Sequence, residues 1–439
     1  MNLSSMMRQH LLRSPLMQAA GIYGAGNLLR QLLPVLLIPV LTRHLTPTDY
    51  GTVAMFGVVV NVMLPVVGLN AHGAINRKYF DRSEIDYPAY VFNALLLVGG
   101  ATAAVAVLLA SSGELIARVT ELPPPWLWIA LVVAAGQSVT LALLALQQAA
   151  ARPVAYAIVQ VTQAVLVSLV TLWLVVGAAQ DWRGPVRAQL LGALIFALVS
   201  LVLFVRGGWI RMTIDREHVR HVLQFGLPLI PHVLAAVAIQ AIDRLIITHY
   251  AGLAQTGVYT LGYQLGMVIG LLEDSFNRAW LPWLFQRLQT ADESVKRRIV
   301  LFTYGYFVAI TLCAVALGAL APWLLSLVAP ARFGGASAYV IWIALGYAFS
   351  GMYKMVSGYI FYAERTGVLA WMTILAAVLN AVTSYLLVPR YGAAGAAYAA
   401  TVGFAASFLL TWLAAARVYP MPWLGALRGL WGKGGAPVK

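Results

Sequence analysis

The sequence predicts an all-α polytopic membrane protein, and three observations support this fold class. Of the 439 residues, 61% are hydrophobic and 10% are charged, too few charges to cover a water-facing surface of this size. The mean hydropathy is +0.81. The apolar runs are continuous for about 20 residues or more, enough for a helix to cross a hydrocarbon core of about 30 Å. A β-barrel would show short alternating segments instead.

About twelve apolar runs qualify as spans by length. In chain order they cover residues 16–42, 50–75, 88–111, 124–149, 153–178, 186–206, 222–250, 255–278, 299–326, 334–362, 367–389 and 393–417. The first turn, residues 42–51, contains Pro47 and Gly51, where one helix must stop and the next begin. Thr48 or Asp49 is placed to cap the second helix.

The basic residues predict the orientation of the chain. Arg8 and Arg13 precede a first span that is too long for a signal-peptide core, so we expect it to be retained. With a cytoplasmic N-terminus, about 20 of the 29 Lys and Arg lie on the cytoplasmic side. The net charge of +14 therefore reflects topology and not nucleic-acid binding, which needs basic residues gathered on a soluble module. We expect a bacterial inner-membrane protein with both termini cytoplasmic.

The polar stretch 207–221 divides the spans six and six. It predicts an N-terminal bundle at 1–206, a cytoplasmic connector at 207–221, a C-terminal bundle at 222–417 and a cytoplasmic tail at 418–439. Residues Thr248–Gly262 can be laid on Thr42–Phe56 with a shift of about 206 residues. Such a repeat predicts a pseudo-twofold axis along the membrane normal, with the substrate path between the halves. The alternative is chance similarity among Gly- and Ala-rich helices.

Ionisable side chains inside spans cost about 2.5–3.5 kcal/mol at the bilayer centre, so they normally face a partner or water. Arg30 lies mid-span on one helical stripe with Asn27 and Gln31, which predicts a cavity-facing cation. The alternative is a structural pair with another helix. Lys354 lies in the tenth span among tyrosines and serines; its alternative is snorkelling to the interface.

Further candidates lie on the second, seventh and eighth spans. Asn61 and Asn70 form a polar face on the second span, and Pro65 is expected to kink it. The seventh span carries Gln240, Asp243 and Arg244. Glu273 and Asp274 close the eighth span, where they would receive a coupling ion or gate the inner mouth. The alternative is that they are ordinary span-end charges.

The stretch LTRHLTPTDYGTVAMF, the basic turn NRKYFDR after the second span and the six-plus-six plan resemble a known family. It is the polysaccharide-export branch of the multidrug/oligosaccharidyl-lipid/polysaccharide exporter superfamily, the Wzx-like flippases. The resemblance implies two helical bundles around a cavity that alternates between the membrane faces. It also implies an undecaprenyl-pyrophosphate-linked oligosaccharide as substrate, for O-antigen, capsule or exopolysaccharide synthesis.

Such a substrate needs fixed cations, hydrogen-bonding side chains and aromatic faces along its path. The expected substrate-binding residues are Asn27, Arg30, Gln31, Asn61, Asn70, Gln240, Arg244 and Lys354, and the expected ion-coupling or gating residues are Asp243, Glu273 and Asp274. We expect no cofactor, and H⁺ or Na⁺ as the coupling ion. Membrane lipids surround the chain, and a polysaccharide polymerase or chain-length regulator is an expected partner.

Other functions fit the sequence less well. We expect a transporter and not an enzyme, because no His and carboxylate set has metal-ligand spacing and no P-loop is present. The lone Cys313 excludes an intramolecular disulfide framework. A multidrug/cation antiporter of the same superfamily is one alternative, although it would favour buried acids over these basic residues. A peptidoglycan-precursor flippase is the other.

Overall fold

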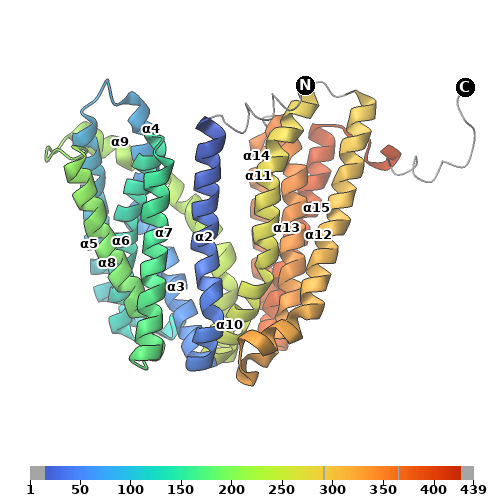
Figure 1. The fold of residues 1–439 in the computed structure, drawn as a ribbon, viewed down its shortest axis with the longest axis horizontal. Helices are drawn as coiled ribbons and strands as arrows, with labels where there is room; N and C mark the ends of the chain where they lie inside the picture. The colour runs from blue at the N-terminus through green and yellow to red at the C-terminus, as the bar shows by residue number, and fades with distance from the viewer. Residues whose placement is uncertain (1–14, 290–291, 364, 427–439) are drawn as a thin grey trace, which may run out of the picture. The chain divides into compact units, whose positions relative to one another are not determined.

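The computed structural model describes residues 15–289, 292–363 and 365–426 (Figure 1). Within these ranges the side chains of a few residues, including Gln240, lie outside the description. The described residues are overwhelmingly helical and contain no strand, which confirms the predicted all-α class. The chain divides into two compact units, one ending at His249 and one beginning at Tyr250.

The first unit contains the described helices that precede α10. In chain order they are α2 (Pro15–His44), α3 (Pro47–Gly68), α4 (Ala71–Lys78), η1 (Tyr79–Asp81), α5 (Tyr87–Thr120), α6 (Pro124–Ala149), α7 (Pro153–Leu172), the π-helical η2 (Trp173–Gly177), α8 (Arg183–Arg206), α9 (Arg216–Gly226) and η3 (Leu227–Leu229). Helix α2 packs on α7, and α6 packs on both α3 and α8. Helix α10 (Ile230–Gly266) runs through the division into the second unit.

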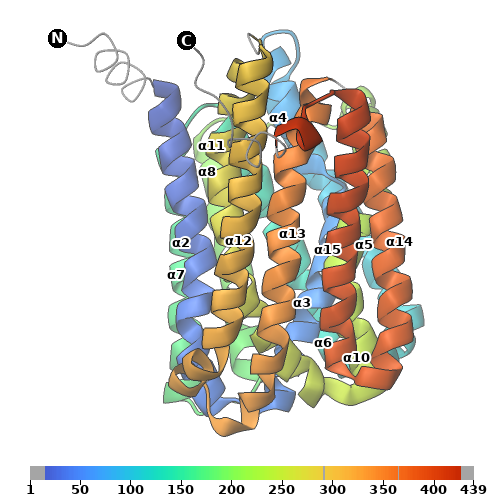
Figure 2. The ribbon, with the colours of Figure 1, turned by 90° about the vertical axis from the view of Figure 1, so that its right-hand side faces the viewer.

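The second unit is built around α13. Its elements after α10 are α11 (Val268–Gln289), α12 (Glu293–Val328), η4 (Ala331–Ala336), α13 (Ser337–Tyr362), α14 (Thr366–Tyr391) and α15 (Ala393–Val418). Helix α13 packs against α11, α12 and α15, and α14 packs against α15 (Figure 2). The buried residues of α13 form the centre of this unit's hydrophobic core.

Ten helical segments within the described ranges are long and apolar enough to cross a membrane. They match ten of the twelve predicted spans. The predicted spans 222–250 and 255–278 are helical but are not among the ten. The first is interrupted by η3, and the second crosses the break between α10 and α11 and carries Glu273 and Asp274.

The turn between α2 and α3 differs in one detail from its prediction. The cap of α3 is Thr46, and neither Thr48 nor Asp49 takes that position. The Thr46 Oγ1 accepts from the Asp49 N–H at 3.1 Å, and the Asp49 carboxylate accepts from the Thr46 N–H at 2.9 Å. This reciprocal capping box satisfies two N–H groups that the first turn of a helix leaves free.

Two features recur in both units, as the predicted internal repeat requires. The non-helical Gly252 breaks α10 206 residues after Thr46, at the position that the sequence overlay assigns to the α2–α3 turn. The neighbouring pairs also correspond in chain order. In the first unit they are α3 with α6, α5 with α6, α6 with α8 and α7 with α8; in the second they are α11 with α13, α12 with α13, α13 with α15 and α14 with α15. Chance similarity does not produce a shared packing pattern.

The connector 207–221 falls within the compact unit that ends at His249, whereas the sequence predicts a bundle boundary at residue 206. Backbone groups of the connector bond to the start of α5. The Arg211 N–H donates to the Pro88 carbonyl at 3.2 Å. The Asn93 side chain donates to the Thr213 carbonyl at 2.8 Å and accepts from the Asp215 N–H at 3.1 Å. These bonds fix the connector against the start of α5.

Candidate functional site

A stripe of glycines brings α10 and α11 close to α13. Gly262, Gly266 and Gly270 recur every fourth residue. A Cβ added to any of them would lie within 2.8 Å of an atom in the η4–α13 segment. The atoms met belong to Ala336, Ile343 and Tyr347, respectively. Small residues at this spacing let helix backbones approach closely. The stripe therefore sets the distance at which the next turn of α11 meets α13.

That next turn carries Glu273, and α13 provides room for it at Gly351. A Cβ on Gly351 would lie 3.1 Å from Glu273 Oε2 and 2.6 Å from the Tyr306 hydroxyl. Glu273 is 2% exposed. A buried carboxylate therefore lies against α13 where an alanine would collide with it.

Lys354 joins the two acidic residues that the sequence placed at the end of the eighth span. Its Nζ donates to Glu273 Oε1 at 3.2 Å and also to Asp274 Oδ1. The Ser350 hydroxyl donates to Glu273 Oε1 at 2.9 Å. The Lys354 side chain is 26% exposed and that of Asp274 is 51% exposed. Lys354 is thus held by ion pairs to both carboxylates.

The Lys354 cluster comprises Glu273, Asp274, Ser350 and Lys354, and the Tyr306 hydroxyl lies beside Glu273 at Gly351. Phe276 stacks on Tyr306 with ring centroids 4.5 Å apart. The Tyr347 hydroxyl donates to the Tyr263 hydroxyl at 2.9 Å. Glu273 Oε2 is buried and has no hydrogen-bond partner among the described residues. A buried carboxylate with one unbonded oxygen can take up a proton or a small cation, and its lysine partner can transfer to another anion.

A second polar group lies between α2 and α7. The Gln160 Nε2 donates to Asn27 Oδ1 at 3.1 Å. One turn earlier, the rings of Tyr23 and Tyr156 meet edge to face with centroids 5.0 Å apart. Arg30 lies one turn after Asn27 and is exposed. Sequence reasoning missed Gln160, although an amide in the middle of an apolar span is the signal that identified Asn27.

The remaining expected site residues lie on α2, α3 and α10. Gln31 is partly buried on α2, and Asn61 is exposed on α3. Asp243 is buried and Arg244 partly buried on α10. Gln240 lies outside the described side chains.

Asn70 is placed at a break between helices and not on the face of a continuous span. Leu69 and Asn70 adopt φ values of 47° and 49°, which separate α3 from α4 inside the predicted span 50–75. The Asn70 Nδ2 donates to the Gly226 carbonyl at 3.4 Å, and the residue is 7% exposed. These contacts give Asn70 a packing role toward α9.

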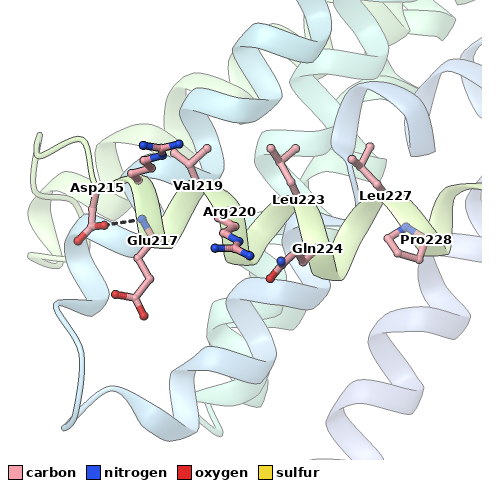
Figure 3. A pocket seen from close by; sticks show the side chains of 9 residues that line it. Asp215, Glu217, Val219, Arg220, Leu223, Gln224, Leu227 and Pro228 are labelled. Atoms are coloured by element: carbon pink, nitrogen blue, oxygen red, sulfur yellow. Dashed lines mark hydrogen bonds between the residues drawn. The ribbon is translucent and has the colours of Figure 1, made fainter.

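An open hollow of about 970 Å³ runs along α9 (Figure 3). Arg220 and Gln224 line it beside the apolar Val219, Leu223 and Leu227. The lining of the hollow includes both acidic and basic residues from the start of α9. None of the expected site residues lines it. Since α9 and η3 supply the whole lining, the hollow is open surface beside a helix, and we assign it no function.

Comparison with known proteins identifies the family. The family model described as polysaccharide biosynthesis protein matches residues 16–288. The chain is 24% identical over 366 residues to the Lsg locus putative protein 1 of Haemophilus influenzae, covering 82% of this chain and 88% of that protein. An uncharacterized membrane protein of Haemophilus influenzae is 22% identical over 369 residues, covering 83% and 88%.

Solved structures share the fold at low identity. The lipid II flippase MurJ in an inward closed conformation matches with a TM-score of 0.71 and 13% identity, covering 94% of this chain and 92% of that one. A multidrug resistance MATE family transporter in its inward-facing conformation matches with a TM-score of 0.63 and 16% identity, covering 92% and 96%. These likenesses support the polytopic helical fold.

Proposed function

The chain belongs to the polysaccharide biosynthesis protein family, and on that basis we propose that it flips an undecaprenyl-pyrophosphate-linked oligosaccharide across the bacterial inner membrane. The glycan would serve O-antigen, capsule or exopolysaccharide synthesis. Translocation would proceed by alternating access, with both termini of the chain in the cytoplasm.

The Lys354 cluster is the observation that carries this proposal. The Lys354 ammonium group pairs with the carboxylates of Glu273 and Asp274, beside a core of apolar and aromatic side chains. A pyrophosphate entering the site would compete with Glu273 and Asp274 for that ammonium, because both ligands are anionic. Release of Glu273 would leave a buried carboxylate that must take up a proton or Na⁺. Substrate and coupling ion would thereby be linked through one lysine.

The remaining residues receive roles by their chemistry. Arg30 and Arg244 would attract the pyrophosphate or an acidic sugar. Asn27, Gln31, Asn61 and Gln240 would bond sugar hydroxyls, while Asp243 would join Glu273 and Asp274 in ion coupling. The lipid tail would remain in the bilayer. A polymerase or chain-length regulator would receive the product on the outer side.

The test measures lipid-linked glycan in each leaflet of a deletion strain, restored with wild type, Arg30→Ala or Arg30→Lys. We expect glycolipid to accumulate on the cytoplasmic side and surface polysaccharide to disappear. Wild type restores export, Arg30→Lys restores part of it and Arg30→Ala restores none, at equal protein levels. Equal export from the two variants would remove Arg30 from the path.

The phenotype of the same deletion strain distinguishes two other transport functions from the proposed one. The buried carboxylates Asp243 and Glu273, 4% and 2% exposed, suit a multidrug/cation antiporter. That function predicts normal surface glycan and altered sensitivity to cationic drugs. A peptidoglycan-precursor flippase predicts accumulation of lipid II with loss of cell-wall synthesis.

A further inference from the structure

The group between α2 and α7 has a regular construction. Tyr23 and Asn27 lie four residues apart on α2, and Tyr156 and Gln160 lie four residues apart on α7. The two rings meet at one level and the two amides at the next. We call these four residues the α2–α7 seam.

Close backbone approach holds the seam together. A Cβ on Gly26 would lie 3.2 Å from the Cβ of Ala157, so the glycine lets α2 approach α7 between the two levels. The contacts advance in the same direction along both helices, which therefore run parallel. Four helical residues span about 6 Å, roughly the length of one sugar ring.

Two polar atoms of the seam lack partners. Gln160 Oε1 and the Tyr23 hydroxyl are buried and form no hydrogen bond among the described residues. Gln160 is 7% exposed. Exchanging oxygen and nitrogen in both amides keeps the Asn27–Gln160 bond and still leaves one buried polar atom of Gln160 unpaired. An unpaired buried polar group is destabilising, so these two atoms carry an energetic cost that apolar side chains would avoid.

Other parts of the seam are accessible. Asn27, Tyr156 and the part of Tyr23 below its buried hydroxyl are partly exposed, and Arg30 is exposed three residues beyond Asn27. That spacing corresponds to about 4.5 Å along the helix axis. Along α2, the tyrosine ring and the amide of the seam are followed by the cation Arg30. In the glycolipid, the sugar is likewise followed by the pyrophosphate.

We propose that the α2–α7 seam is a sugar-recognition subsite for the glycan residue attached to the pyrophosphate, an inference that rests on the proposed function. Asn27 and Tyr23 bond sugar hydroxyls, and the tyrosine rings pack against the apolar face of the sugar. Gln160 acts as a positioning residue that fixes the orientation of the Asn27 amide. Arg30 binds the adjoining phosphate.

Binding to the purified full-length protein in nanodiscs tests this assignment with two probes. One is undecaprenyl pyrophosphate, which carries no sugar. The other is the lipid-linked oligosaccharide extracted from a strain that cannot polymerise it. We expect Gln160→Leu and Tyr23→Phe each to weaken glycolipid binding by about tenfold, the value of one good hydrogen bond, and to leave undecaprenyl pyrophosphate binding unchanged. Arg30→Ala should weaken both.

Two further variants separate recognition from packing. Gln147→Leu is the matched control, because Gln147 on α6 is 8% exposed and its Oε1 is also unpartnered, but it lies outside the seam. It should bind both probes as wild type does. The exchange Asn27→Gln with Gln160→Asn keeps both amides and their combined length, so it should recover most of the glycolipid affinity that Gln160→Leu loses.

Four results would overturn the assignment. Equal weakening of both probes by Gln160→Leu and Tyr23→Phe would make the seam structural, and unchanged glycolipid binding in both variants would exclude it from the site. Equal affinity of wild type for the two probes would reject the sugar subsite while leaving flipping intact. Failure of wild type to bind either probe would reject the proposed function with it.

Discussion

At the scale of single residues, Lys354 balances the charges of two carboxylates in the second unit. One ammonium neutralises a carboxylate that is 2% exposed and also bonds a second one that is half exposed. Breaking a buried pair by removing one partner leaves an uncompensated buried charge, whereas removing both can be nearly neutral. The contribution of this ion pair to stability can therefore be measured by paired substitutions.

Lys354→Met should destabilise the protein by about 3–5 kcal/mol, because Glu273 would be left buried without its cation. The double variant Glu273→Gln with Lys354→Met should recover most of that loss, and Lys354→Arg should lose little. Unfolding of the purified protein in detergent measures the three variants. A double variant as unstable as Lys354→Met would contradict the ion-pair interpretation.

At the scale of elements, α9 is fastened to the first unit by its inner face. Val222 and Gly226 are buried, and Phe225 packs against Gly73 of α4. The Asp215 carboxylate caps the helix by accepting from the Glu217 N–H at 2.7 Å. These contacts explain why a stretch as polar as 207–221 folds onto the bundle.

Gly226→Ala should loosen this attachment, because the added Cβ would collide with the Leu69 carbonyl oxygen. We expect a loss of about 1–3 kcal/mol, the usual cost of overpacking. Hydrogen exchange in residues 207–229 measures it. Gly113→Ala on α5 is the control, because nothing lies within 4 Å of its added Cβ. Equal protection in the two variants would show that the close approach is unimportant.

The attachment of α9 should also depend on pH through His221. The Tyr90 hydroxyl lies 2.9 Å from His221 Nδ1. Burial, followed by the charges of Lys78 and Arg77, holds the pKa of His221 below its usual value. The titratable and charged groups facing it are Tyr90, Lys78, Arg77, Asp81 and His218.

Because the folded state disfavours the protonated imidazole, its stabilising contribution is present above about pH 6.5, the usual pKa of histidine. It is lost as the pH falls through the lower folded-state pKa. The protection of α9 amides, measured relative to their intrinsic exchange rate at each pH, should therefore fall between neutral and acidic pH. His221→Gln, which retains a hydrogen-bonding partner for Tyr90, should remove this loss of protection. The same pH profile in that variant would assign the effect to other groups.

At the scale of the whole molecule, the proposed topology can be tested with single cysteines. Cys313 is exposed on α12, so it is first replaced by serine. Ser83→Cys lies between η1 and α5, and Glu114→Cys lies near the far end of α5. We expect an impermeant thiol reagent to label Glu114→Cys in intact cells and Ser83→Cys only after permeabilisation. The reverse pattern would place the termini outside.

The candidate site was only partly predictable from the sequence. The sequence indicates Lys354 as a substrate cation and Glu273 and Asp274 as ion-coupling or gating residues, but it does not predict that the three side chains meet. Their meeting depends on the glycine stripe at Gly262, Gly266 and Gly270, whose effect appears only when α13 packs against it. The sequence also indicates Asn70 as a substrate-binding residue. It does not predict the hydrogen bond from Asn70 to Gly226, because the two residues are 156 positions apart in the chain.

The sequence by itself determined the class of this protein, the positions of most spans and the repeat. Each follows from local apolar length or from residue spacing, which a single chain segment carries. Tertiary structure alone decided that the connector joins the first unit, that Lys354 lies between two carboxylates and that Gln160 bonds Asn27. Those outcomes depend on which helix faces meet, and side-chain partners more than 70 residues apart are fixed by packing and not by local pattern.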